Sequence, residues 1–570
     1  MIRRLSYFMF FILLILVLPN CAQAKQYFKE LLLRIELNGK SLSEIALILQ
    51  DRQGQLLVSA ADLEHWRFRI PNAAPFIRNK EAFYSLNDMP GVQTTLLPSK
   101  MVLKILAEPK VFKSQSYKVK PYHLNAKRPE SIGSYLNYDL NMPPNNGQLS
   151  LNGVFELGVF GPYGVMNHSV LMNSQSFKSP LFASKNGLIR LNSVWTYDMP
   201  ESMTSLRVGD SITQAGMWGR AVSYGGLQFS TNFATQPRFI SYPLPTISGQ
   251  AVLPSIVDLY INNAHIYQKQ VEPGPFDIRS LPAINGQGEM TLVTRDLMGR
   301  ERVISVPYYA SSNLLAKDLL DFSISAGFVR NNYGLDSFDY DKPFISAVYR
   351  KGISDNFTRE LQASVARHNQ VIGIGGTYLL QKFILLDGAA VVSHSSNGNG
   401  ALLNVGAERN STSFNFGTDI TYTTKRFQQL GTPEQSQSPK LQSTIYFGIP
   451  VFQRGSLGLS FVSRQYYQAG QNSRLLSGSY SMNVSQDWTG ILTGLTNIGG
   501  TNSKGIFFTL TRRIGKTNTA SVNYNRQNDT TQYGMQFNHS SPERYGLDYY
   551  GSIYPGANGN LQSGLNWSTV

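Results

Sequence analysis

The sequence predicts an all-β protein whose largest part is a transmembrane antiparallel β-barrel of about 24 strands. Aromatic residues make up 12% and charged residues 15% of the 570 residues, and the 49 glycines and 30 tyrosines favour strands and turns over helices. Segments in which apolar and polar residues alternate recur from about residue 134 to the end. The rest of the chain is predicted to form an inserted β-sandwich and a small mixed α/β domain at the N-terminus.

Residues 1–24 have the features of an export signal. Arg3 and Arg4 precede an apolar run, and Ala22-Gln23-Ala24 supplies the small residues of a cleavage site. A lipoprotein signal ending at Cys21 is the alternative, although Pro19 and Asn20 stand where such signals have small residues. Cleavage after Ala24 would remove the chain's one cysteine and, with it, disulfides, thiolate metal sites and cysteine catalysis.

Residues 25–121 are predicted to form a separate, mostly β domain. Leu33, Ile35 and Leu37 alternate with polar residues, and Asn38-Gly39 supplies a hairpin turn. Ser59 to Asp62 resembles a capping box that opens a short helix through Trp66. The lysine-rich stretch from 108 to 128 shows no periodicity and is predicted to be an exposed linker, with residues 122–133 leading into the next domain.

Residues 134–249 and 309–570 alternate with a period of two. Tyr533, Met535 and Phe537 interleave with Gln532, Gln536 and Asn538, and Leu476, Tyr480 and Met482 interleave with serines. A soluble sheet gives the same pattern in one segment, but soluble sandwiches need a domain boundary every ~100 to 200 residues, and none is apparent after Ala310. We therefore expect lipid to cover the apolar faces of some 22 to 26 strands.

Neither membrane-spanning helices nor nucleic-acid binding is expected from the composition. After the signal, no apolar run approaches the roughly 20 residues that a membrane-spanning helix needs. The formal net charge of +15 is scattered along alternating segments, so nucleic acid is not expected as a partner, whereas attraction to anionic lipid headgroups is compatible with it.

Residues 250–308 interrupt the alternating pattern and are predicted to be an inserted all-β domain. Ser255 to Ile261 reads as a strand closed by a turn at Asn262-Asn263, and Gly274-Pro275-Phe276 is predicted to be a second turn. Two further strands are expected at 289–294 and 302–306. Because a barrel of this size would leak solutes, we expect the inserted domain to be a plug.

The sequence offers no positive sign of catalysis. The seven histidines are dispersed, and no catalytic, cofactor-binding or metal-binding residues are predicted. Gly515-Lys516-Thr517 ends like a phosphate loop, but Leu510 replaces the first required glycine, so we predict a turn. Gly373 to Gly376 lies in a strand pattern, where glycines mark bends or bulges.

Several short motifs between Arg190 and Gly352 carry a resemblance to a known family. They are Arg190-Leu191-Asn192, Trp195-Thr196-Tyr197, Val208-Gly209-Asp210-Ser211, Gly225-Gly226-Leu227-Gln228, Thr231-Asn232-Phe233-Ala234, Gln236-Pro237, Tyr242-Pro243-Leu244-Pro245, Val271 to Phe276, Arg295-Asp296, Gly299-Arg300-Glu301 and Tyr349-Arg350-Lys351-Gly352. Together they resemble the fimbrial outer-membrane usher family, most of all its archaic, spore-coat-protein-U-associated branch. The segment from Tyr84 to Val92 is similar to the N-terminal domain of that family.

The resemblance implies an outer-membrane secretion pore that assembles pili and is not an enzyme. Its implied partners are periplasmic chaperone-subunit complexes and pilus subunits, with no cofactor, and a homodimer is left open. An aromatic tail grips the chaperone in ushers, and Tyr27 and Phe28 stand near the mature start, where a frayed terminus is equally expected. Ushers usually continue into two further periplasmic domains, which this sequence is expected to lack after Val570.

A plugged outer-membrane channel or transporter for small solutes is the alternative function. Such transporters usually carry the plug at the N-terminus, not within the strand series, so the position of the plug separates the two. A soluble exported enzyme or adhesin is a third hypothesis, which the number of apolar faces argues against.

Overall fold

The computed structural model describes residues 27–568 except 119–129, 142–143, 146–147, 150–151, 174–186, 238, 263, 280, 282–285, 297–299, 433–437, 469–471, 500–502, 542–545 and 556–559. The predicted signal at 1–24 and most of the predicted linker at 122–133 lie outside the described residues. In the described part, no helix is long and apolar enough to cross a bilayer.

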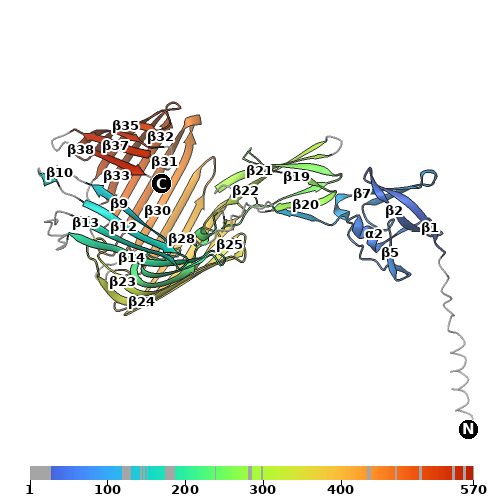
Figure 1. Cartoon of the computed structure of the whole chain (residues 1–570), viewed down its shortest axis with the longest axis horizontal. Helices are drawn as coiled ribbons and strands as arrows, with labels where there is room; N and C mark the ends of the chain where they lie inside the picture. Colours follow the sequence, from blue (N-terminus) through green and yellow to red (C-terminus); the bar gives the residue numbers. More distant parts are fainter. Residues whose placement is uncertain are drawn as a thin grey trace, which may run out of the picture. The chain divides into compact units, whose positions relative to one another are not determined.

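The N-terminal domain, blue in Figure 1, is a seven-stranded sheet in the order β4-β5-β3-β2-β1-β7-β6 with one short helix. Its elements are β1 (Lys29–Leu37), β2 (Lys40–Gln50), β3 (Leu56–Ser59), α2 (Ala60–His65), β4 (Phe76–Arg78), β5 (Glu81–Ser85), β6 (Val92–Leu97), η1 (Pro98–Lys100), β7 (Val102–Ala107) and η2 (Pro109–Val111).

The sequence pattern of this domain is found in its packing. Leu33, Ile35 and Leu37 are buried in one core, because alternate residues of β1 face the same side of the sheet. Asn38 has a φ of 48°, as the predicted Asn-Gly turn requires. Ser59 caps α2 by accepting a hydrogen bond from the backbone N–H of Asp62, which confirms the predicted helix start.

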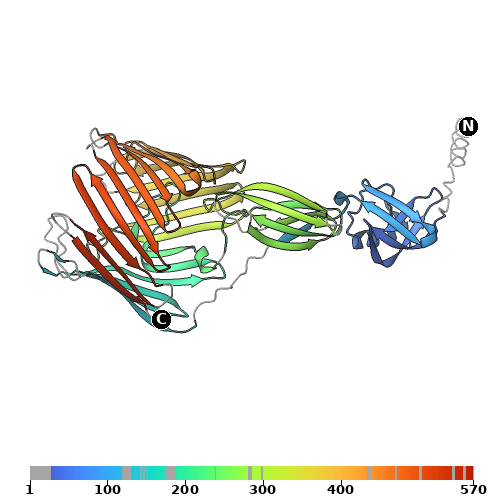
Figure 2. The same cartoon turned by 90° about the horizontal axis from the view of Figure 1, so that it is seen from above.

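The inserted domain consists of two small sheets, drawn in green in Figure 2. One sheet has the order β19-β18-β21-β22 and the other β17-β20-β8. The strands are β17 (Ile247–Ala251), β18 (Ser255–Ile261), β19 (Ala264–Val271), β20 (Gly274–Arg279), β21 (Gly286–Asp296) and β22 (Glu301–Ala310), with β8 (Gln115–Lys118) coming from before the barrel. Val257, Leu259 and Ile261 are buried, so β18 turns one apolar face to the core.

Two sequence expectations in and near this domain were wrong. Gly274, Pro275 and Phe276 open strand β20 and do not form the turn itself, because Phe276 and Ile278 supply alternate buried residues that favour a strand. Part of the stretch expected to be an exposed linker, Gln115 to Lys118, pairs as β8 with β20. An edge strand of the inserted sheet offers unpaired backbone groups there, which outweigh the weak local pattern of β8.

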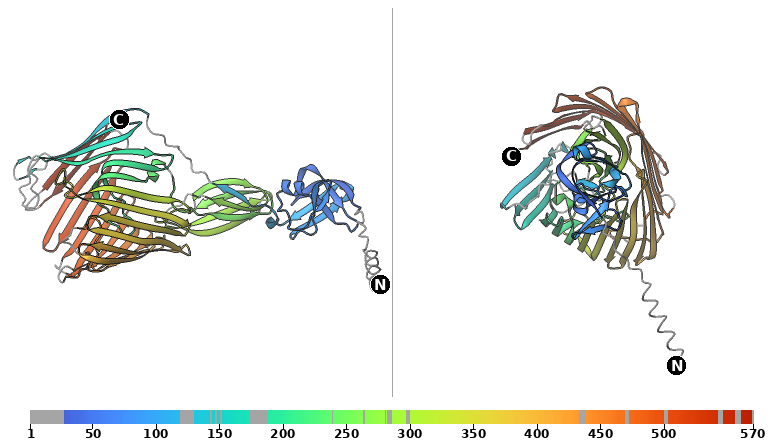
Figure 3. Two further views of the ribbon diagram at one scale, coloured as in Figure 1. Left: turned by 90° about the horizontal axis from the view of Figure 1, so that it is seen from below. Right: turned by 90° about the vertical axis from the view of Figure 1, so that its right-hand side faces the viewer.

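In the residues that the structure describes, the barrel has 22 antiparallel strands. In barrel order they are β9 (Gly133–Asn141), β12 (Asn152–Gly161), β13 (Gly164–Asn173), β14 (Leu188–Met199), β15 (Thr204–Ile212), β16 (Ser223–Thr231), β23 (Leu320–Arg330), β24 (Tyr340–Ser354), β25 (Phe357–Ala366), β26 (Asn369–Leu380), β27 (Ile384–Ser395), β28 (Gly398–Arg409), β29 (Asn415–Thr423), β30 (Leu441–Val451), β31 (Gly455–Gln465), β32 (Ser473–Asn483), β33 (Trp488–Gly499), β34 (Lys504–Ile514), β35 (Asn518–Gln527), β36 (Thr530–His539), β37 (Gly546–Tyr554) and β38 (Asn560–Ser568). Figure 3 shows how these strands curve around one interior.

Short connections complete the chain. The elements β10 (Pro144–Asn145) and β11 (Gln148–Leu149) form a two-stranded sheet, and η3 (Phe233–Thr235) and η4 (Phe452–Arg454) are single 3-10 turns. Gly515 has a φ of 68° in the turn between β34 and β35, so the predicted turn at Gly515 to Thr517 is confirmed. The strand count lies within the expected 22 to 26 and is two below the central estimate.

Candidate functional site

The two faces of the barrel wall differ in polarity. In β25, Thr358, Glu360 and Ser364 are buried on the inner face, whereas Leu361 and Val365 are exposed on the outer face. The outer face of β36 is formed by Tyr533, Met535 and Phe537, all of them exposed. Because successive residues of a strand point to opposite faces, the wall has an apolar outer face and a polar inner face.

A charged cluster lies on the inner face of three neighbouring strands. Arg350 of β24 stands between Asp321 of β23, at 3.4 Å, and Glu360 of β25, at 3.1 Å. Thr231 also donates a hydrogen bond to Asp321. The cluster places two carboxylates and one guanidinium in the inner wall, so its net charge is negative and further hydrogen-bond donors are favourable there.

The connection between β15 and β16 supplies those donors. We call residues 213–222 the inner-wall loop, because they fold against the inner face of the wall between β23 and β28. The backbone N–H of Met217 donates to Glu360 Oε1 at 2.6 Å, and Gln214 Nε2 donates to Asp321 Oδ2 at 3.3 Å. Val222 and Thr213 close the base of the loop with two hydrogen bonds of 3.0 and 2.9 Å.

Trp218 fixes the tip of this loop. Its ring is 8% exposed and packs in a cluster with Val391, Leu402 and Phe427. Gly373 and Gly375 of β26 leave room for the ring, since a Cβ atom at either position would lie 2.7 or 2.6 Å from it. The glycine run that the sequence placed inside a strand therefore leaves the space in which the indole ring of Trp218 packs.

A second contact site joins the base of the inserted domain to the turn after β28. The Gln287 backbone N–H donates to the carbonyl of Asn410 at 2.9 Å, and Arg409 Nη2 donates to Gln287 Oε1 at 2.7 Å. The Asn410 backbone N–H donates to the hydroxyl of Tyr309 at 3.2 Å. The Arg409 guanidinium lies 3.6 Å from the ring centroid of Phe383. All five residues belong to the same compact unit as the barrel.

Residues of two sequence motifs meet where the start of β14, the end of β15 and the end of β23 lie together. Arg190 of β14 and Arg330 of β23 both bond to Asp210 of β15, the second at 3.2 Å. Tyr340 donates a further hydrogen bond to Asp210, and Arg190 lies 4.7 Å from the ring centroid of Phe338. This network has a structural explanation, because it ties the connection between β23 and β24 to β14 and β15.

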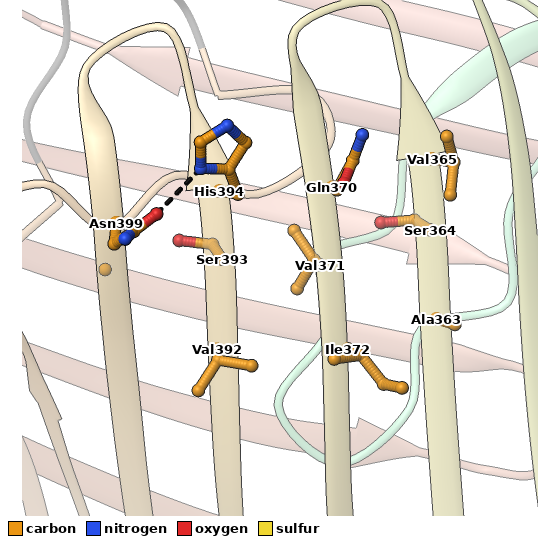
Figure 4. A pocket seen from close by; sticks show the side chains of 11 residues that line it. Ala363, Ser364, Val365, Gln370, Val371, Ile372, Val392, Ser393, His394 and Asn399 are labelled. Carbon is orange, nitrogen blue, oxygen red and sulfur yellow. Dashed lines mark hydrogen bonds between the residues drawn. The ribbon is translucent and has the colours of Figure 1, made fainter.

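A groove of about 570 Å³ runs across the outer face of β25 to β28, and Figure 4 shows the side chains that line it. Val365, Ile372 and Val392 line it and are more than half exposed, and His394 accepts or donates one 2.7 Å hydrogen bond with Asn399 at its end. The lining contains no nucleophile activated by a neighbouring base. An apolar groove on this face is a place for acyl chains.

The structure brings no set of catalytic groups together in the part of the chain that it describes. In these residues, no three or more His, Cys, Asp or Glu side chains are placed to hold a metal ion. Near the start of the described chain, Phe28 packs 4.5 Å from Phe76 between ring centroids, while Tyr27 is 73% exposed. The inner-wall loop was missed in the sequence, where only its two glycines and Trp218 distinguish it.

Residues 173–552 match the family model described as outer membrane usher protein. The chain is 26% identical over 194 residues to the outer membrane usher protein FasD of Escherichia coli, with 34% of this chain and 23% of FasD covered. It is 24% identical over 320 residues to FimD of Escherichia coli K12, covering 52% and 35%, and 24% identical over 344 residues to HifC of Haemophilus influenzae, covering 54% and 39%. The chain therefore spans 23% to 39% of the length of these relatives.

A solved structure has the same fold. It is the cryo-EM structure of the Escherichia coli P pilus tip assembly intermediate PapC-PapD-PapK-PapG in the second conformation. The TM-score is 0.56 at 15% identity, with 94% of this chain and 71% of that chain covered.

Proposed function

This chain belongs to the outer membrane usher family, and from that premise we propose that it recruits chaperone-subunit complexes in the periplasm and secretes pilus subunits through its barrel. The observation that carries the proposal is a barrel of the usher family whose strand series is interrupted, between β16 and β23, by a small inserted domain. The cryo-EM relative is itself part of a complex of an usher with PapD, PapK and PapG, which supports partners of the same kind for this chain.

In this proposal the inserted domain is the plug of the pore. A barrel of 22 strands encloses a lumen wide enough to leak solutes, so a cell needs it closed between secretion events. The domain has its own buried core and enters the chain at the ends of two neighbouring strands, where it can move without breaking the barrel ladder. The contacts of Gln287 and Tyr309 with the turn at Asn410 would hold its base.

The polar inner wall supports the passage of folded proteins. Side chains such as Gln532, Gln536 and Asn538 of β36 offer hydrogen-bonding groups but few long apolar surfaces, so a passing subunit has little to adhere to. The proposed secretion and ordering of subunits involve no covalent chemistry. Ordering of subunits comes from exchange between alternative β-strand partners, for which the chain needs neither a nucleotide nor a nucleophile.

The solute transporter is the less favoured function. In such transporters the plug usually precedes the first barrel strand in the sequence. In this chain six barrel strands, β9 and β12 to β16, precede the inserted domain.

The proposed function is tested in the organism that encodes the chain. Deleting its gene should remove one class of surface fibres seen by negative-stain electron microscopy, and the full chain supplied in trans should restore them. Fibres that persist in the deletion strain would overturn the proposal. Loss of uptake of a small solute with unchanged fibres would support the transporter instead.

A further inference from the structure

Several specific contacts join the N-terminal domain to the inserted domain, although about 130 residues separate the two domains in the chain. Strand β8 follows the last element of the N-terminal domain and pairs in parallel with β20. Four residue pairs form the ladder, from Gln115 with Phe276 to Lys118 with Arg279. The sheet of the inserted domain is therefore completed by a strand that enters from the N-terminal domain, as Figure 2 shows.

Asn38 bridges the two domains with its side-chain amide. Its Nδ2 donates to the carbonyl of Ala107 in the N-terminal domain at 3.0 Å and to the carbonyl of Val252 in the inserted domain at 2.9 Å. Its Oδ1 accepts from the backbone N–H of Ala107 at 2.8 Å. The residue is 6% exposed, so water cannot readily replace these partners.

A close approach of the backbone of β20 to a buried ring is the third contact. A Cβ atom at Gly274 would lie 2.8 Å from Cβ of Phe112, and Gly274 has a φ of 124°. Phe112 is 2% exposed and packs edge-on against Phe68 of the N-terminal core at 5.0 Å. The only residue type that fits easily at position 274 is therefore glycine.

Two further contacts surround this joint. Gln115 Nε2 donates to the carbonyl of Glu272 at 3.0 Å, and Lys40 lies 4.0 Å from the carboxylate of the same residue. The second is exposed and adds little. The contacts come from the turn after β1, from the residue after η2 and from β8, so three separate segments of the N-terminal side fix both the distance and the orientation of the inserted domain.

We propose that the N-terminal domain and the inserted domain move as one rigid body, so that a partner captured by the first acts directly on the second. The regulatory part of this inference rests on the proposed function of the inserted domain as a plug. Movement of the plug then carries the N-terminal domain with it, and Asn38 is a positioning residue for that coupled movement.

The rigid body is tested without reference to function. Spin labels are attached to Thr95→Cys and Val303→Cys, both at exposed positions, in the full chain reconstituted in lipid nanodiscs. Cys21 lies in the predicted signal, so no native cysteine is expected to compete for label in the mature chain. Double electron-electron resonance should give one narrow distance distribution. A distribution several times broader in the otherwise unchanged chain would overturn the proposal.

Two variants then weaken the contacts between the two domains, one in the N-terminal domain and one in the inserted domain. Asn38→Asp keeps the size and the turn preference of the residue but loses the amide donor, and Gly274→Ala places a methyl group against Phe112. Each should broaden the distance distribution at least twofold. Asn79→Asp and Gly54→Ala are matched controls, because Asn79 and Gly54 have φ values of 51° and 84° in exposed turns, and nothing lies within 4 Å of a Cβ atom at Gly54. Equal broadening in the controls, or none in the two variants, would contradict the role of these contacts.

The coupling to function is tested by locking the joint. Ser116→Cys and Asp277→Cys stand at paired Cα positions of β8 and β20, so oxidation can link them. If the two domains move together, the oxidised and the reduced protein should support the same number of surface fibres. Loss of fibres on oxidation that a thiol reductant reverses would show that β8 must leave β20. Absence of fibres in every form would count against the proposed function alone, since the distance measurement still decides the joint.

Discussion

The backbone N–H of Met217 lies 2.6 Å from Oε1 of Glu360, a carboxylate on the inner face of β25. A loop between two strands is thereby fastened to the wall of the lumen, three strands away from its own hairpin. Glu360 belongs to a charged cluster with Arg350 and Asp321. The tip of the loop is held by the buried side chain of Trp218.

Replacing Trp218 with alanine should release the inner-wall loop. Removal of a buried tryptophan side chain typically costs about 3 to 5 kcal/mol, which a short loop has few other contacts to offset. Trypsin should then cleave after Arg220, which is exposed within this loop, and mass spectrometry of the folded protein detects the fragment. Trp488→Ala is the control, and equal resistance of Trp218→Ala and the unchanged protein would contradict the anchoring role.

Substitutions at two neighbouring positions of β36 should separate the lipid face from the lumen face. Met535→Arg places a charge on the exposed apolar face and should destabilise the barrel by roughly 2 to 4 kcal/mol if the position is near the bilayer midplane. Gln536→Arg places the same charge on the polar inner face and should cost little. Urea titration of folding into liposomes measures both, and equal destabilisation would mean that the faces are not assigned correctly.

The network around Asp210 should contribute strongly to barrel stability. Asp210→Asn leaves the guanidinium groups of Arg190 and Arg330 without their carboxylate in a buried place, and breaking a buried pair in this way typically costs about 3 to 5 kcal/mol. The variant should unfold at lower temperature in a heat-modifiability gel. Asp529→Asn, in an exposed turn, is the control and should migrate as the unchanged protein does.

Alkaline pH should weaken the pairing of β8 with the inserted domain. Burial raises the pKa of Tyr117 above its usual value of 10.0, and the nearby Arg67 offsets this in part. A group whose pKa is raised by folding contributes stability below pH 10 that is lost as the pH passes its folded pKa. The spin-label distance distribution should broaden as the pH is raised above 10, and less so in Tyr117→Phe. Identical broadening in both proteins would assign the effect to other groups.

Much of the fold could be predicted because its signals are local. Leu33, Ile35 and Leu37 alternate as β1 requires, and Ser59 starts α2 through a hydrogen bond to a residue three positions away. The alternation at Tyr533, Met535 and Phe537 recurs often enough to indicate a membrane barrel. The resemblance to ushers added what periodicity does not contain, namely the kind of barrel.

The contacts that position the candidate site could not be predicted because they join distant parts of the chain. Met217 and Glu360 are 143 positions apart, and Asn38 and Val252 are 214 apart. Neither pair produces a periodic pattern in the sequence, because each joins one residue of a turn or loop to a single residue of a distant segment. Strand β8 was missed for the same reason, because its partner β20 lies beyond six strands of the barrel.

Single-channel conductance in a planar bilayer tests the central claim most directly. The unchanged chain is compared with a variant in which residues 247–310, the span of β17 to β22, are replaced by a short glycine-serine linker. A plug-gated pore predicts a nearly silent full chain and a large, stable conductance after the deletion. An equally small conductance in both proteins, with the barrel shown to be folded by its heat-modifiable mobility, would contradict it.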